Sequence, residues 1–105
     1  MNTVYVSQDA IPLGLKWYPG DAVSLQWRVT PVDWSGTYVA KLRKYDNPAS
    51  EEVATFTVSA VWDAVNLYTT FTVTLASAVP EGQYWWSCKQ NGTITRFSGL
   101  VLVSA

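Results

Sequence analysis

Few side chains in this sequence carry groups that catalyse reactions or bind metals. The 105 residues include eight acidic residues, one cysteine (Cys88) and no histidine. Without histidine, neither a Ser-His-Asp nor a Cys-His arrangement can form, and one cysteine does not build a structural zinc site. The adjacent carboxylates Glu51 and Glu52 lie beside Pro48 in a predicted loop, whereas a glycosidase pair needs a cleft. We therefore expect a protein that is not an enzyme and has no metal or other cofactor.

The other acidic residues and the cysteine have structural interpretations. Almost all the other carboxylates fall in predicted turns, where they form Asx turns or are solvated. They are Asp9, Asp21, Asp33, Asp46, Asp63 and Glu81. Cys88 shares its predicted strand face with Tyr84 and Trp86, which favours a small core residue over a reactive thiol.

The charge of the chain argues against two classes of partner. Seven basic and eight acidic residues give a net charge of −1, with no cluster of Lys and Arg. Neither nucleic acid nor an anionic membrane is therefore an expected partner. Only 14% of the residues are charged, against about 25% in an average soluble domain. So low a charge predicts either that part of the apolar surface is covered in an assembly or that the surface is unusually prone to associate, and both indicate a partner.

Aromatic residues are the conspicuous feature, with six Trp and six Tyr. Trp27 and one residue of the Trp85-Trp86 pair are expected in the core. Adjacent strand residues point to opposite faces, so we place Trp86 inside and Trp85 outside. Four further aromatics fall in loops or in the N-terminal segment: Trp17, Tyr18, Trp34 and Trp62. Trp85 with some of these is predicted to form an exposed patch that binds protein, and all five are candidate interface residues. A sugar-binding platform of Trp85, Trp34 and Trp62 is the alternative.

The elements that carry these residues are predicted to be β strands. Alternation of apolar and polar residues with period two predicts strands at about 22–30, 37–43, 53–60, 67–75 and 83–90, and a last one ending near residue 103. Asn91-Gly92 predicts a two-residue type I′ hairpin turn. Its register would pair Gln90 with Thr93, Cys88 with Thr95, Trp86 with Phe97 and Tyr84 with Gly99.

Strand number and spacing predict the fold class. Six or seven strands at roughly ten-residue intervals are typical of an antiparallel, immunoglobulin-like β-sandwich of about seven strands. We assign this sandwich to residues 21–105. Residues 1–20 are expected to form an N-terminal arm with one or two short strands, including Val4-Tyr5-Val6. This arm would cover a sheet edge or lie on a neighbouring subunit.

Several turn and strand motifs resemble a known family. Gly20-Asp21 opens a strand, Asp33-Trp34-Ser35-Gly36 leads into a strand that ends at Arg43, and Gly82-Gln83-Tyr84-Trp85-Trp86 precedes the last hairpin. Over about residues 20–103 the chain resembles small immunoglobulin-like structural proteins of tailed bacteriophages. These include the N-terminal domain of baseplate upper proteins and minor tail and capsid decoration proteins. It departs from their pattern at Ser87-Cys88, where an acidic residue is common, and residues 1–19 have no counterpart.

The resemblance implies a virion structural protein, either a capsid decoration protein or a small head or tail accessory. Its expected partners are copies of itself and other virion proteins such as the major capsid or tail protein. The first residues show no signal-peptide pattern and no apolar run approaches the ~20 residues of a membrane span. We therefore expect synthesis in the host cytoplasm. A secreted immunoglobulin-like adhesion domain is disfavoured by the missing signal and disulfide.

Overall fold

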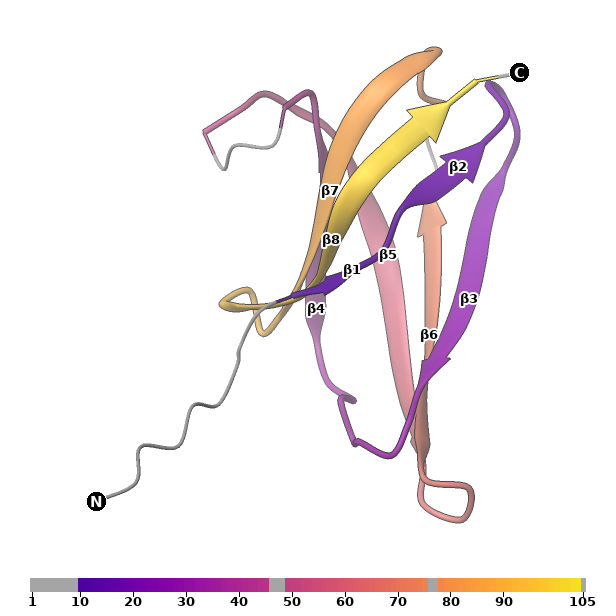
Figure 1. Cartoon of the computed structure of the whole chain (residues 1–105), viewed down its shortest axis with the longest axis vertical. Helices are drawn as coiled ribbons and strands as arrows, with labels where there is room; N and C mark the ends of the chain where they lie inside the picture. Colours follow the sequence, from indigo (N-terminus) through magenta and orange to yellow (C-terminus); the bar gives the residue numbers. More distant parts are fainter. Residues whose placement is uncertain (1–9, 46–48, 76–77, 105) are drawn as a thin grey trace.

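The structure, a computed structural model, describes residues 10–45, 49–75 and 78–104 (Figure 1). These residues form eight β strands and no helix, so none of them belongs to a helix that could cross a membrane. The strands are β1 (Ile11–Pro12), β2 (Leu15–Trp17), β3 (Val23–Val29), β4 (Tyr38–Arg43), β5 (Glu52–Asp63), β6 (Tyr68–Leu75), β7 (Gly82–Gln90) and β8 (Ile94–Val103). The predicted all-β class is confirmed.

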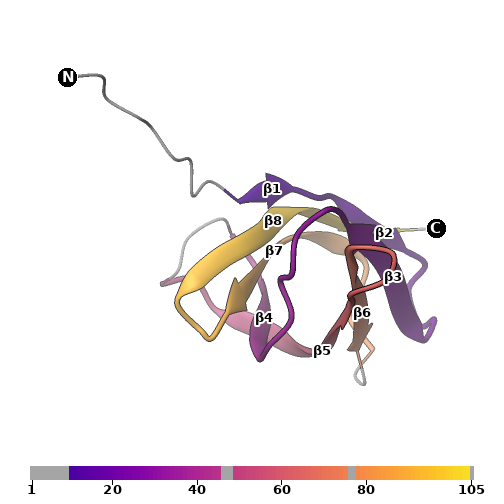
Figure 2. The same ribbon diagram turned by 90° about the horizontal axis from the view of Figure 1, so that it is seen from below.

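The strands form one curled sheet that closes about half of a barrel (Figure 2). Its order is β1-β8-β7-β4-β5-β6-β3. β2 also pairs with β8, along residues 101–103, after the residues of β8 that pair with β1. β1 and β2 run parallel to β8, whereas all other pairs are antiparallel. This mixed sheet is not clearly the seven-stranded antiparallel sandwich that we predicted. The reason is β5, whose first part pairs with β4 and whose second part pairs with β6, so the two halves share a strand.

Period-two alternation places one face of the curled sheet inside. In β6 the apolar Phe71, Val73 and Leu75 are buried, and the threonines at 70, 72 and 74 are only partly covered. The same alternation buries Tyr38, Ala40 and Leu42 of β4. Aromatic rings fill the centre, where Phe71 contacts the rings of Trp27, Tyr38 and Phe97 at centroid distances of 4.9–5.6 Å. The buried faces of β4 and β6 are those predicted from the sequence, because the alternation of side chains along a strand depends on that strand alone.

The β7–β8 hairpin forms, but its register differs from the prediction. Asn91 and Gly92 do adopt positive φ, 53° and 73°, yet the ladder begins at Gln90–Ile94 and leaves three residues in the turn. A further shift follows, because Lys89 pairs with Thr95 and Cys88 with Phe97. The ladder thus leaves Arg96 as an extra residue, a β-bulge. Trp86 consequently faces Gly99 and Tyr84 faces Val101.

The N-terminal segment explains why position 99 is glycine. Between β1 and β2, the backbone of Leu13 crosses Gly99, and the Leu13 amide donates to the Ser98 carbonyl at 2.9 Å. A Cβ on Gly99 would lie 2.8 Å from the Leu13 carbonyl carbon. The indole N–H of Trp86 donates to the Leu13 carbonyl oxygen at 2.7 Å. The segment is therefore attached to the β8 edge of its own sheet, while Val4-Tyr5-Val6 lies outside the described residues.

Candidate interaction surfaces

Groups with reactive chemistry are scarce in the structure, as they are in the sequence. Within residues 10–45, 49–75 and 78–104, no three His, Cys, Asp or Glu side chains lie close enough to hold a metal ion. Cys88 is buried, and burial raises the pKa of its thiol to about 12. The thiolate, which is the nucleophilic form, is thus nearly absent at neutral pH. Cys88 therefore acts as a small core residue.

Two carboxylates organise loops. The Asp33 carboxylate accepts hydrogen bonds from the Ser35 hydroxyl at 2.6 Å and from its amide at 3.0 Å. Asp63 accepts from the amides of Val65 and Asn66 and from the Asn66 side chain, all at 2.9–3.0 Å. These bonds stabilise the charged forms and lower the pKa of both carboxyls, with the Ser35 and Asn66 side chains contributing most. Each carboxylate closes an Asx turn.

Trp85 lies on the outer face of the sheet, opposite to buried Trp86. Its ladder neighbours are Arg43 on β4 and Leu100 on β8. Glu52 lies 3.6 Å from the Arg43 guanidinium and 3.3 Å from the Lys41 ammonium. Trp85 is itself half-buried. The outer face around it thus combines an aromatic ring with the aliphatic side chain of Leu100 beside a small charge network.

Trp34 and Trp62 lie at one end of the half-barrel, around the buried Thr69. The Trp34 amide donates to the Thr69 hydroxyl at 2.8 Å, and that hydroxyl donates to the Val32 carbonyl at 2.7 Å. Trp62 is the ladder partner of Thr69. The Trp34 ring packs edge-on against Phe97, and the Arg96 guanidinium lies 4.6 Å from the Trp34 ring centroid. Both tryptophans are half-buried, and both help to pack this end of the half-barrel.

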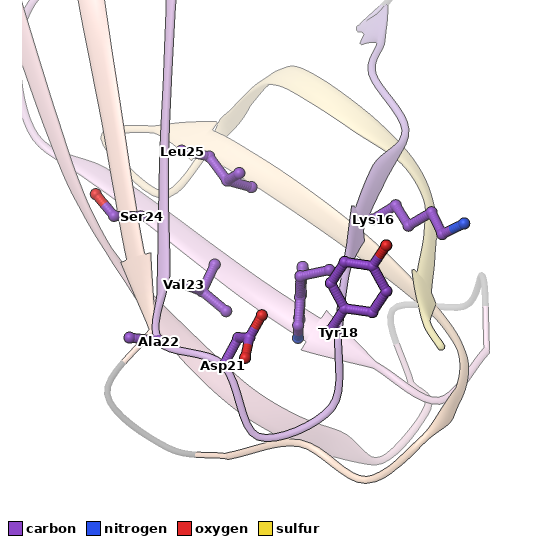
Figure 3. Close-up of a pocket in the computed structure, with 8 residues that line it drawn as sticks. Lys16, Tyr18, Asp21, Ala22, Val23, Ser24 and Leu25 are labelled. Atoms are coloured by element: carbon purple, nitrogen blue, oxygen red, sulfur yellow. The ribbon is translucent and has the colours of Figure 1, made fainter. Parts of the chain in front are cut away.

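Trp17 is a core residue, so its predicted place in an exposed patch is wrong. Its side chain is 8% exposed, and its ring meets Phe56 edge-on at 6.2 Å. The cause is β2, whose alternation turns Leu15 and Trp17 inward once the strand pairs with β8. Tyr18 follows at the turn and is 60% exposed. It lies at a pocket of about 370 Å³ lined by residues 16–18 and 21–25 (Figure 3).

The five aromatics chosen from the sequence therefore do not form one patch. Trp85 lies on the outer face and Trp17 lies in the core. Tyr18 follows β2 in the β2–β3 turn, and this turn lies at the upper end of the molecule in Figure 1. Trp34 belongs to the β3–β4 connection and Trp62 to the end of β5, two segments that lie toward the lower end. The sheet itself separates Trp85 from Trp34, because Trp34 packs against the inward-facing Phe97. A single sugar platform of Trp85, Trp34 and Trp62 is not present.

Among the residues that the structure describes, the loop between β5 and β6 contains the most exposed apolar side chain, and the sequence prediction missed it. In the loop, Val65 and Leu67 are 89% and 51% exposed, and Val61 near the end of β5 is 61% exposed. The loop is held by the Leu67 amide, which donates to the Asp63 carbonyl at 2.8 Å, and by the Thr30 hydroxyl, which donates to the Leu67 carbonyl at 2.7 Å. Leu67 has a φ of 58°, a conformation that costs a non-glycine residue about 1–2 kcal/mol. The sequence does contain a signal for this exposed loop, because the aliphatic residues Val65 and Leu67 lie beside Asp63 and Asn66, which favour turns.

Comparison with known proteins adds no assignment. No model of a known protein family matches the chain, and no curated protein is similar enough to be a relative.

Proposed function

We propose that this chain is a non-enzymatic structural protein of a bacteriophage particle, either a capsid decoration protein or a small head or tail accessory. It would act in the virion, after synthesis in the host cytoplasm, through contacts with copies of itself and with other virion proteins. The virion assignment depends on the motifs at residues 20–21, 33–43 and 82–86, which resemble those of tailed-phage proteins. The low charge of the chain supports an assembly role.

The observation that carries the proposed protein contact is the β5–β6 loop. Val65 and Leu67 are aliphatic and largely exposed, and the Asp63 hydrogen bonds hold the loop in one shape. Strained backbone persists where the surrounding structure imposes it and is concentrated at functional sites. An ordered loop also loses little conformational entropy on binding. The pair Val65 and Leu67 is therefore suited to insert into an apolar pocket of a partner protein.

The immunoglobulin-like fold class is part of the same proposal. In such domains, one sheet contains the third, sixth and seventh strands, and the second and fifth strands belong to the other. Here β8, β7 and β4 are consecutive neighbours, and β6 and β3 form the other end of the order. In this interpretation β1 and β2 are the broken first strand and β5 is the strand shared by both sheets. This arrangement supports the resemblance to the phage proteins.

Co-sedimentation with purified phage heads and tails tests the proposal. The particles are those of the phage that, under the proposal, encodes this chain. The wild-type chain is expected to sediment with one of the two particles, and Val65→Asp is expected to reduce that binding because it places a charge in an apolar contact. Ser59→Asp, at an exposed position of β5, is the matched control and should bind like wild type. A wild-type chain that binds neither particle would contradict the proposal.

Carbohydrate binding is the alternative, and Trp85 is the residue that favours it. Its ring is the predicted platform member that lies on the outer face of the sheet, where it is partly exposed. Calorimetric titration with a panel of oligosaccharides would detect such binding. Loss of a measured sugar affinity in Trp85→Ala, with the affinity unchanged in Trp34→Ala, would favour this function over a virion role.

A further inference from the structure

β3 is an edge strand with a free side. All seven of its residues pair with β6, and β3 is the last strand of the sheet order. No strand among the described residues pairs with its other side. In Figure 1 β3 forms the right-hand margin of the molecule beside β6. Such an edge presents a row of backbone N–H and C=O groups that can pair with another strand.

This edge lacks the features by which proteins usually prevent such pairing. Natural edge strands carry proline, bulges or inward-pointing charges, or are very short. The sequence Val-Ser-Leu-Gln-Trp-Arg-Val of β3 contains no proline or glycine, and its ladder with β6 runs without a register shift. Its one charged residue, Arg28, faces outward with its guanidinium 4.4 Å from the Tyr68 ring centroid. The edge is therefore open to a strand of matching pattern.

The inner face of β3 is also incompletely covered. Leu25, Trp27 and Val29 pack against the core but are only half-buried, whereas Phe71 and Val73 of β6 are fully buried. The indole nitrogen of Trp27 is buried without a hydrogen-bond partner. The apolar core thus ends at β3. A further strand paired with the free side of β3 would extend the apolar inner face of the sheet.

We infer that the free edge of β3 pairs with β3 of a second copy, antiparallel and about a two-fold axis at Gln26. Gln26 is the central residue of the strand. This register places Leu25 opposite Trp27 of the partner and Val23 opposite Val29, so apolar residues meet on the inner face. Ser24 faces Arg28. The two Arg28 residues are offset by four positions, about 13 Å along the strand, which exceeds the Debye length of about 10 Å.

A second copy suits this edge because the strand is its own complement. An antiparallel pair about a two-fold axis maps the inner face onto the inner face and the polar outer face onto the polar outer face. The net charge of −1 adds almost no repulsion between copies. This inference deepens the self-association within the proposed function and assigns it to the edge of β3, a different surface from the β5–β6 loop that would bind the particle.

Sedimentation velocity on charge variants of Gln26 tests the pairing. The wild-type chain is expected to dimerise. Gln26→Lys places two like charges opposite each other at the axis and should weaken the dimer roughly fivefold or more. Gln26→Glu should do the same, and an equimolar mixture of the two variants should recover a dimer at least as tight as wild type. Because Gln26 is exposed, each variant is expected to keep the wild-type thermal midpoint under monomeric conditions.

The control and the particle assay make the result decisive. Ser59→Lys carries the same charge on the same outer face, two strands from the axis, and should dimerise like wild type. A monomeric wild-type chain, a Gln26→Lys dimer of unchanged affinity, or a mixture that does not recover would each overturn the inference. The particle assay separates the two proposals, since Gln26→Lys should still bind the head or tail while Val65→Asp should still dimerise.

Discussion

Replacement of Gly99 by alanine is the most direct test of how the N-terminal segment is attached. The new Cβ would overlap the Leu13 carbonyl, lying 2.8 Å from its carbon and 3.3 Å from the Gly14 nitrogen. Both contacts are with backbone, so the segment between β1 and β2 must move. Overpacking of this kind costs about 1–3 kcal/mol. Loss of the Trp86–Leu13 hydrogen bond adds about 0.5–1.5 kcal/mol, so Gly99→Ala should lower the free energy of unfolding by about 1.5–4.5 kcal/mol.

Gly14→Ala is the matched control. Its Cβ would meet the Leu100 carbonyl oxygen at 3.5 Å, an ordinary contact, so its effect should stay within about 0.5 kcal/mol. Urea denaturation followed by tryptophan fluorescence measures both variants, and hydrogen exchange should show reduced protection of the β2 amides in Gly99→Ala alone. Equal stability of the two variants would refute the proposed close approach of Leu13 to β8.

A double-mutant cycle identifies the shared partner. Trp86→Phe removes the indole donor to the Leu13 carbonyl, and Gly99→Ala displaces the same carbonyl. Because the shared loss is this hydrogen bond, the double variant should retain about 0.5–1.5 kcal/mol more stability than the sum of the single effects predicts. Simple additivity would show that the two residues act on different parts of the segment.

Three further predictions concern the β5–β6 loop and the stability of the protein at acid and at alkaline pH. Leu67→Gly should raise the free energy of unfolding by about 0.5–1 kcal/mol, because glycine relieves the strain at a φ of 58° and this gain exceeds the entropic cost of glycine. A lower thermal midpoint for this variant would contradict the prediction. Hydrogen bonds from Asn66 and Val65 lower the pKa of Asp63, so the unfolded chain takes up this proton first, and stability should fall below about pH 4. Asp63→Ala should have a shallower acid slope in denaturation curves. Burial raises the pKa of Cys88 to about 12, whereas the pKa of cysteine in an unfolded chain is about 8.5. The unfolded chain therefore loses this proton first, and the free energy of unfolding should decline as the pH rises from about 8.5 to about 12. The decline should be smaller in Cys88→Ala. At neutral pH the native thiol should react with Ellman's reagent only as fast as the protein unfolds.

The sequence predicts the strands well because their signal is local. Alternation of apolar and polar residues sets the two faces of β3, β4 and β6 without reference to other parts of the chain. β5 was predicted to end near residue 60 but extends to Asp63. Its pairing with β6 includes Trp62 opposite Thr69, so a residue expected in a loop belongs to a strand. Strand ends depend on such partners, which alternation does not identify.

The hairpin register and the place of Trp17 depend on contacts between distant segments. Asn91-Gly92 favours a two-residue type I′ turn by residue type alone. In the folded chain the bulge at Arg96 lets its side chain stack on Trp34 and donate to the Gln90 side chain. Trp17 lies between proline and glycine residues, which suggested an exposed arm. Its burial follows from the parallel pairing of β2 with β8, a long-range contact that no local pattern predicts.

The sequence by itself determined an all-β chain with two-faced strands, an inward Trp86 beside an outward Trp85, and the lack of histidine chemistry. These follow from residue types and from the period of the pleat. Only the tertiary structure decided that the strands form one curled sheet, that the five aromatics do not form one patch, and that the β5–β6 loop and the β3 edge are exposed among the described residues. The physical reason is that exposure is a property of the packed chain: a side chain or a strand edge is free only where no distant segment has come to cover it.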